Sequence, residues 1–286
     1  MKKRKNIIHS PGMHWVGNGF PVRSVFSYDQ MGRELDPFLL LDYAEPYRFE
    51  PGREKRGVGS HPHRGFETVT FAFQGEVEHR DSSGGGGVIK PGDVQWMTAG
   101  AGLLHEEFHS EDFTKNGGLF EMVQLWVNLP AANKNAPPRY QNLSAEKIPV
   151  VALPEQAGQL RVVAGTFDDT QGPANTFTDI NLWDIHQNKE TTTTLPAPDG
   201  HTTALLVMKG KISTDGDSTG GGSLVIFDRN GSNIEINAES DSHYLLLGGK
   251  PIGEPIVGQG PFVMNNKQEI MEAYRDFQIG KMGSLE

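Results

Sequence analysis

The sequence predicts an all-β protein, built of two β-barrel domains with an α-helix at the C-terminus. Short runs of β-branched and aromatic residues alternate with Gly, Pro and Asp along most of the chain, which is typical of antiparallel strands joined by tight turns. The 35 glycines and 18 prolines supply those turns. A chain of 286 residues is also long for one small domain, so two domains are expected.

The first half contains a series of predicted hairpins between about Val22 and Trp126. The glycine run Ser82–Gly87 is expected to be a hairpin loop and not a phosphate loop, because it opens no helix and has no Lys-Ser/Thr end. The polar, proline-containing stretch Ala131–Pro138 is interpreted as a linker, which divides the chain into domains 1–140 and 141–286. The predicted strands are Thr68–Phe73, Glu76–Asp81, Val88–Ile89, Val94–Thr98 and Leu119–Leu129.

The second half repeats this strand-rich pattern and then ends differently. Ile270, Tyr274 and Phe277 fall at helical spacing, with Asn266 and Glu269 placed as a capping box and Gly280 as a stop. One amphipathic helix is therefore expected to close the chain. The strands predicted before it are Leu160–Gly165, Asn181–Ile185, Ala204–Met208, Ser223–Phe227 and His243–Leu247.

Composition and charge exclude several classes of function. The absence of cysteine removes disulfides, thiolate ligands and a cysteine nucleophile. A net charge of -10 argues against direct binding to nucleic acid or to an anionic membrane. The basic run Lys2–Lys5 is followed by His, Ser and Pro, so it does not predict a signal peptide, and no segment approaches a membrane span. We expect a soluble, cytoplasmic protein.

Two short clusters, His61–His63 and His105–Glu107, each place two metal-binding side chains at positions i and i+2. Residues two apart on a strand share one face, so each cluster aims a pair of ligands at one point. The clusters are about forty residues apart, a distance suited to neighbouring strands of one barrel. If the two segments lie side by side, three imidazoles and one carboxylate converge: those of His61, His63, His105 and Glu107.

The strand period favours Glu107 over Glu106 as the fourth ligand, unless a bulge shifts the register. Four nitrogen and oxygen ligands suit a divalent first-row ion with octahedral preference and leave two positions open for chemistry. Structural zinc normally closes its tetrahedron and favours thiolates, which this chain lacks. Fe(II) is the first choice, and Cu, Ni, Co, Zn or Mn could occupy the same ligands.

Four segments carry a family resemblance: His61–Val69, Pro91–Gly100, Gly102–Glu107 and Gln124–Pro130. Together they resemble the pirin family, whose members are two-domain proteins of the cupin superfamily. The resemblance is specific over roughly the first 140 residues. It implies two cupin-type jelly-roll barrels, with one iron in the N-terminal barrel and a C-terminal domain without metal. The ligands that it implies are His61, His63, His105 and Glu107.

The resemblance also implies quercetin 2,3-dioxygenase activity, in which a flavonol is opened by dioxygen. Glu107 would then be both a metal ligand and the catalytic general base that takes the flavonol proton. Two alternatives stay open. One is an iron-dependent, redox-sensing protein that binds a transcription factor or a metabolic enzyme as its partner. The other is a cupin enzyme that acts on another small molecule.

Several further residues are candidates for supporting roles. Arg64 and Gln124 could orient metal ligands, and Glu67 is expected to be structural or to lie behind the ligands. His186, His201 and His243 stand alone in the second half of the sequence, so no metal is expected there. A planar aromatic substrate needs an apolar slot, although ordinary core packing explains the same side chains. The candidates for that slot are Phe71, Phe73, Trp96, Met97, Leu103 and Met122.

Overall fold

The computed structural model describes residues 1–285 and consists mainly of antiparallel β-sheets. Its Cα positions form two compact units, each assembled from separate stretches of the chain. The N-terminal barrel comprises Gly12–Arg33, Phe38–Ala145 and the chain from Ile252 onward. The C-terminal barrel comprises Met1–Pro11, Glu34–Pro37 and Glu146–Pro251. The predicted all-β class with two cupin-type barrels is confirmed.

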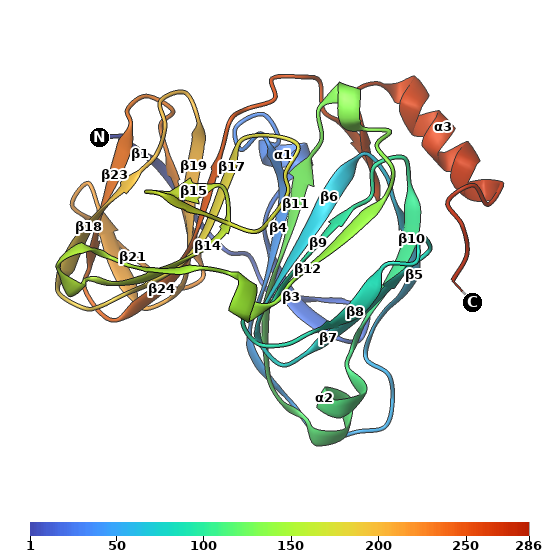
Figure 1. Cartoon of the computed structure of the whole chain (residues 1–286), viewed down its shortest axis with the longest axis horizontal. Helices are drawn as coiled ribbons and strands as arrows, with labels where there is room; N and C mark the ends of the chain where they lie inside the picture. Colours follow the sequence, from blue (N-terminus) through green and yellow to red (C-terminus); the bar gives the residue numbers. More distant parts are fainter. Residues whose placement is uncertain (286) are drawn as a thin grey trace. The chain divides into compact units, whose positions relative to one another are not determined.

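The N-terminal barrel contains two main sheets (Figure 1). One has the order β12-β9-β6-β11-β4-β3-β2 and the other the order β5-β10-β7-β8. The strands of the larger sheet are β2 (His14–Val16), β3 (Phe20–Ser27), β4 (Phe38–Phe49), β6 (Phe66–Gln74), β9 (Val94–Thr98), β11 (Gly118–Asn128) and β12 (Arg139–Leu143). Those of the smaller sheet are β5 (Gly57–His63), β7 (Val77–Asp81), β8 (Gly86–Ile89) and β10 (Leu103–His109). This unit also holds α1 (Tyr28–Met31), α2 (Glu111–Asn116), η1 (Ala131–Asn133), β25 (Val257–Gln259), β26 (Phe262–Met264) and α3 (Lys267–Gln278).

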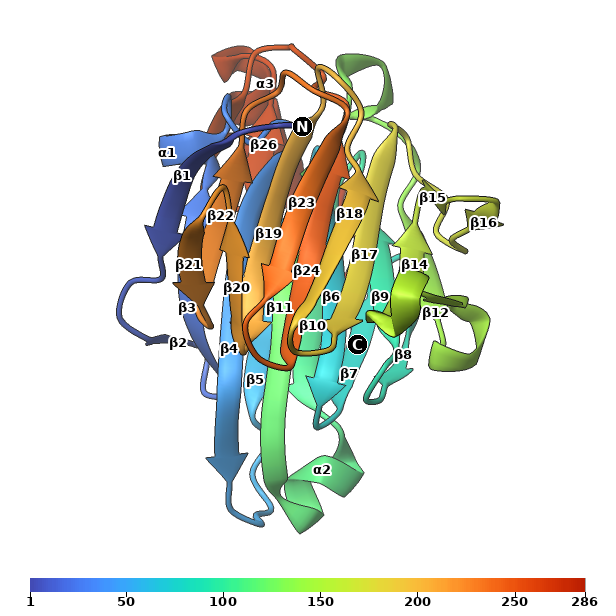
Figure 2. The ribbon, with the colours of Figure 1, turned by 90° about the vertical axis from the view of Figure 1, so that its left-hand side faces the viewer.

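The C-terminal barrel is built in the same way, and most of its strands are labelled in Figure 2. Its sheets have the orders β1-β22-β19-β24-β17-β14-β13 and β18-β23-β20-β21. Trp183, Tyr244 and Leu205 belong to the apolar cluster inside it. The larger sheet consists of β1 (Arg4–His9), β13 (Val150–Ala152), β14 (Gly158–Ala164), β17 (Ile180–Gln187), β19 (Thr202–Lys209), β22 (Ser223–Phe227) and β24 (Ser242–Gly249). The other elements are β15 (Thr166–Phe167), β16 (Thr170–Gln171), β18 (Thr191–Pro196), β20 (Lys211–Thr214), β21 (Asp217–Gly220), β23 (Asn233–Ala238), η2 (Ala145–Lys147) and η3 (Pro154–Gln156).

The strands predicted from sequence are present, with ends shifted by a few residues at most. The loop Ser82–Gly87 lies largely between β7 and β8, which pair as a hairpin. The closing helix is also confirmed as α3. The side chain of Asn266 caps it by accepting a hydrogen bond from the backbone N–H of Glu269 at 2.9 Å. Gly280 follows the helix with φ of 75°, a left-handed conformation that suits glycine.

The linker interpretation of Ala131–Pro138 is wrong, because this stretch connects β11 and β12 within one barrel. It is held there by Lys134, a buried lysine whose Nζ donates to Gly65 O and Val263 O at 2.8 and 2.9 Å. The predicted division into 1–140 and 141–286 also differs from the compact units at both ends of the chain: Met1–Pro11 belongs to the C-terminal barrel, and the chain from Ile252 onward belongs to the N-terminal barrel. The helix α3 packs on β25 and β26 of the N-terminal barrel.

The first residues of the chain form an edge strand that the sequence reading missed. β1 pairs antiparallel with β22, and Figure 2 shows the two side by side. The Nζ of Lys2 is drawn into the C-terminal barrel, where it donates to His201 O and Arg229 O at 2.8 Å each. Part of the basic run therefore serves the fold. In the described residues, no helix is both long and apolar enough to cross a bilayer.

Candidate metal centre

Three histidines predicted as ligands come together inside the N-terminal barrel. β5 and β10 run antiparallel, with His105 opposite His61 and Leu103 opposite His63. The ring centroid of His105 is 4.2 Å from that of His61 and 4.7 Å from that of His63. One ring nitrogen from each of the three lies within 4.8 Å of the others. This spacing suits three nitrogens around one ion.

The hydrogen bonds of these rings determine which nitrogens remain free. His61 Nδ1 is 2.8 Å from Gly59 O, and His63 Nδ1 is 3.4 Å from Pro261 O. A carbonyl oxygen only accepts, so both Nδ1 atoms carry the proton and both Nε2 atoms have a lone pair. His105 Nε2 is buried and has no hydrogen-bond partner. A buried nitrogen without a partner fits a site that is completed by a metal ion.

The electrostatic environment keeps the buried rings neutral. Burial lowers the pKa of His63 well below its usual value, and the neighbouring His61 lowers it further. Burial likewise lowers the pKa of His105, with added effects from His63 and His61. Neutral imidazole is the form that binds metal ions, so at neutral pH these two rings can bind an ion without first losing a proton.

Glu107 faces the same side of β10 as His105, as the strand period predicts. Residues of β10 alternate between buried and partly exposed side chains, and Glu107 is 5% exposed. Glu106 points the other way, where it accepts hydrogen bonds from Arg80. The pairing of β10 with β5 does contain a register shift between His105 and Glu107, but the alternation along β10 is kept.

The carboxylate of Glu107 is held by two glutamine side chains. Gln95 Nε2 donates to Oε1 at 2.5 Å, and Gln124 Nε2 donates to Oε2 at 3.1 Å. A carboxylate oxygen of Glu107 lies within 4.8 Å of ligand atoms of His79 and His105. Gln124 therefore orients this carboxylate, as the sequence reading suggested, while Gln95 was missed.

His61, His63 and Glu107 line a cavity of about 360 Å³. Its volume falls in the range of small-molecule sites, about 300–1,000 Å³. Of the six apolar residues considered for a substrate slot, the cavity wall includes Met122. Among the others, Met97 and Leu103 pack with Tyr140, whereas Phe71 stacks on Phe73. The wall consists of Val16, Phe20, Val22, Asp42, Val58, His61, His63, Glu107, Met122, Gln124 and Trp126.

His79 is a fourth buried histidine of this cluster that the sequence reading missed. It lies on β7 opposite Glu107, with its Nδ1 3.4 Å from Nδ1 of His105. Its Nε2 is 3.1 Å from Oδ2 of Asp81. Burial raises the pKa of Asp81, but hydrogen bonds from His79, Ser83 and Gly85 outweigh it and lower the pKa to about 2. The i, i+2 spacing of His79 and Asp81 on a predicted strand was the available signal.

Arg64 and Glu67 have structural partners away from the ligands. The guanidinium of Arg64 donates to Asp276 at 2.9 Å and to Asn135 at 3.2 Å. Glu67 accepts a 2.7 Å hydrogen bond from Thr98. Thr70, which lies near Glu107, is three positions from Glu67 on β6, so the two side chains lie on opposite faces of the sheet.

Burial raises the pKa of Glu67 from 4.5 to about 7, although the Thr98 hydrogen bond opposes this. The folded chain thus binds this proton more tightly than the unfolded chain. Its contribution to stability is complete below pH 4.5 and is lost as the pH rises through 7. Glutamine does not ionise, so we expect Glu67→Gln to remove this loss. The unfolding free energy of the variant relative to that of the wild type should rise by about 2.5 kcal/mol between pH 5 and pH 8. Urea unfolding at the two pH values measures the difference, and parallel stability profiles would contradict it.

The histidines of the second half are not all isolated in space. The ring of His186 stacks on that of His243, with centroids 3.9 Å apart. His243 Nε2 is 2.6 Å from Oδ1 of Asp184, and Arg161 pairs with the other oxygen at 3.0 Å. Cross-strand pairing of β17 and β24 brings them together, which single positions in the sequence do not reveal. His201 lies apart from this group, in the turn before β19.

Comparisons with known proteins agree with this architecture. The family model of pirin matches residues 19–127, and the model of the pirin C-terminal cupin domain matches residues 182–283. A crystal structure of quercetin 2,3-dioxygenase from Acinetobacter baumannii superimposes with a TM-score of 0.97 and 56% sequence identity, and the match covers 100% of both chains.

Two sequence relatives extend the comparison. A protein of Pseudomonas aeruginosa, provisionally named as a quercetin 2,3-dioxygenase, is 51% identical over 281 residues, which is 98% of each chain. A pirin-like protein of Solanum lycopersicum is 36% identical over 272 residues, covering 93% of this chain and 88% of that one. The similarity therefore spans both barrels.

Proposed function

Because this chain belongs to the pirin family of two-domain cupin proteins, we propose that it is a metal-dependent dioxygenase of the quercetin 2,3-dioxygenase type, which opens a flavonol-like substrate with O2. The observation that carries the proposal is the group of His61, His63 and His105, whose ring nitrogens lie within 4.8 Å of one another, in a barrel where His61, His63 and Glu107 line one cavity. The name of the similar Acinetobacter baumannii enzyme supports the reaction type.

The metal would be held by His61, His63, His105 and Glu107. Imidazole nitrogen and carboxylate oxygen suit Fe(II), our first choice, while Cu, Ni, Co, Zn or Mn could compete for the same donors. When bound, such an ion supplies Lewis acidity toward a substrate oxygen and the capacity for redox chemistry with dioxygen. The buried, neutral state of His63 and His105 favours ligation without loss of a proton.

The cavity provides the place for an aromatic substrate. Side chains such as Phe20, Met122 and Trp126 give it apolar walls, and Asp42 and Gln124 add polar groups. An apolar slot with few polar groups binds a planar ring system and fixes its orientation.

Glu107 is the residue to which we assign proton transfer. Its carboxylate lines the cavity, and Gln95 and Gln124 fix its orientation. An oxygen of Glu107 would take the proton of the flavonol hydroxyl as the substrate binds, because a positioned carboxylate is a competent general base. Because two amide donors already hold the Glu107 carboxylate, its side chain loses little conformational entropy when it adopts the reactive geometry.

The decisive experiment loads the full chain with Fe(II) without oxygen and then adds quercetin and air. We expect oxygen uptake together with loss of the flavonol absorbance, at a rate that follows the metal content of the sample. A chain without added metal is the control. Absence of oxygen uptake by a fully loaded sample would contradict the dioxygenase and favour an iron-dependent interaction protein. Turnover of a different small molecule without oxygen would favour another cupin enzyme.

A further inference from the structure

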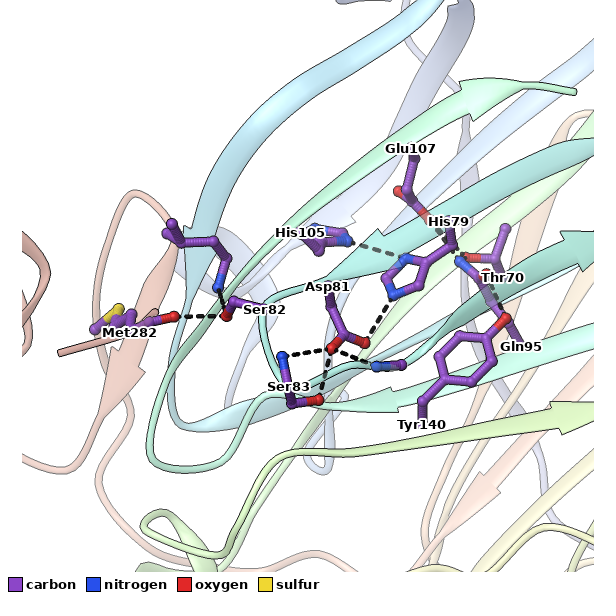
Figure 3. Close-up of polar contacts among 12 residues, drawn as sticks. Thr70, His79, Asp81, Ser82, Ser83, Gln95, His105, Glu107, Tyr140 and Met282 are labelled. Atoms are coloured by element: carbon purple, nitrogen blue, oxygen red, sulfur yellow. Dashed lines mark hydrogen bonds and ion pairs between the residues drawn. The ribbon is translucent and has the colours of Figure 1, made fainter. Parts of the chain in front are cut away.

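Two buried side chains that the proposed ligand set does not use, His79 and Asp81, lie next to His105. Both are on β7, two residues apart. His79 is 0% exposed and Asp81 is 5% exposed. β7 pairs with β10 so that Asp81 is opposite His105. Figure 3 shows hydrogen bonds that run from Asp81 through His79 to His105.

The direction of these hydrogen bonds follows from the chemistry of the end group. The ionised carboxylate of Asp81 only accepts, so the Nε2–H of His79 donates to it. A neutral imidazole that donates from Nε2 has a lone pair at Nδ1, and the Nδ1–H of His105 therefore donates to His79. This tautomer leaves a lone pair on Nε2 of His105, the buried atom without a partner.

Asp81 and His79 are themselves firmly held. Oδ1 of Asp81 accepts from the backbone N–H and the hydroxyl of Ser83 at 2.8 and 2.6 Å, and from the backbone N–H of Gly85 at 3.0 Å. The ring of Tyr140 stacks on His79, with centroids 4.9 Å apart and planes at 13°. The glycine-rich hairpin loop thus fixes the carboxylate, and the stacked ring fixes the imidazole (Figure 3).

His105 differs in this respect from the other two histidines. His61 and His63 place their Nδ1 against backbone carbonyls of Gly59 and Pro261. His105 instead depends on side chains for its tautomer. Partners of this kind orient metal-bound histidines and increase their basicity.

We propose that Asp81 and His79 are positioning residues that fix His105 in the tautomer presenting Nε2 to a divalent metal ion. The inference rests on the proposed metal-binding function and adds two residues to it. It also predicts a specific consequence of changing Asp81. In Asp81→Asn, the donors of Ser83 and Gly85 require an acceptor, so the amide oxygen of the new side chain takes the place of Oδ1. Its NH2 group then takes the place of Oδ2 and faces His79.

An amide NH2 donates, so both hydrogen bonds of the chain would reverse in Asp81→Asn. His79 would then carry its proton on Nδ1, and His105 would carry its proton on Nε2, where the ion should bind. We expect the affinity for Zn(II), used as a probe, to fall by about 10- to 100-fold. Competition with a chelator on the full chain measures it.

Asp93→Asn is the matched control. Asp93 caps the next turn by accepting from the backbone N–H groups of Lys90 and Ala145 at 2.9 and 2.7 Å, with no histidine involved. The second readout is the tautomer of His105 in histidine-labelled protein before Zn(II) is added, measured by ¹⁵N NMR. We expect a protonated Nδ1 in the wild type and in Asp93→Asn, and a protonated Nε2 in Asp81→Asn.

A second pair of variants serves if Asp81→Asn does not fold. In His79→Gln, the amide can still donate to Asp81 and accept from His105, so Zn(II) affinity should stay within a few fold of the wild type. The phenyl ring of His79→Phe can neither donate to Asp81 nor accept from His105, so this variant should lose at least about 10-fold in Zn(II) affinity. The proposal is overturned if Asp81→Asn binds Zn(II) as Asp93→Asn does, if His105 keeps its tautomer, or if the two His79 variants bind equally. A wild-type chain that binds no Zn(II) would overturn the proposed metal site as well.

Discussion

Replacing His63 by alanine is expected to weaken metal binding by about a hundredfold or more, and to lower the rate of flavonol oxidation with it. His63 is 4% exposed, and its Nδ1–H is committed to Pro261 O, so its Nε2 has no other role in the structure. Structural Zn(II) sites with four ligands bind with about 10–16 kcal/mol, and an equal share for each ligand is about 3 kcal/mol. That value corresponds to about a hundredfold loss of affinity or more. Metal content after dialysis and equilibrium competition with a chelator measure it.

His201→Ala is the control for this prediction, because His201 lies in the C-terminal barrel outside the histidine cluster. The metal-free unfolding free energy of both variants should be compared with that of the wild type, so that lost binding is not confused with lost folding. If His63→Ala retains one ion per chain with the affinity of the wild type, His63 is not a ligand and the proposed site is wrong.

Much of the cluster could be predicted because a strand has a period of two. The positions of His61 and His63 on β5 and of His105 and Glu107 on β10 require only that the two strands be neighbours in one barrel. The same period places Glu107 and Glu106 on opposite faces of β10, and Thr70 and Glu67 on opposite faces of β6. Such alternation is local, so it can be read directly from sequence.

The contacts that complete the site could not be predicted, because they join distant parts of the chain. Pro261, which holds His63, lies 198 residues away in sequence and belongs to a ribbon that returns to the N-terminal barrel. His79 joins the site only because β7 pairs with the far edge of β10. Polar composition suggested a linker at Ala131–Pro138, but the buried Lys134 shows that polar residues there satisfy backbone carbonyls instead.

Glu107→Gln is expected to separate metal binding from proton transfer. The variant keeps three imidazoles and an amide oxygen, so we expect it to retain part of its metal. It loses the carboxylate that takes the flavonol proton, and general-base catalysis of this kind contributes about 10²- to 10⁴-fold. The oxidation rate of metal-saturated enzyme should therefore fall by at least about 100-fold. Stopped-flow loss of flavonol absorbance under air, normalised to bound metal, measures it.

The surroundings of Glu107 explain why a glutamine cannot simply replace it. Two amide NH2 groups, from Gln95 and Gln124, donate to its two oxygens. A glutamine at this position accepts with one oxygen only, so its own NH2 would meet one of these donors and force it to turn away. Gln95→Ala, which removes a donor and keeps the carboxylate, is the matched control and should lose far less rate. Equal metal loss in Glu107→Gln and His63→Ala would mean that Glu107 acts as a ligand alone, and the proton would then need another acceptor at the cavity wall.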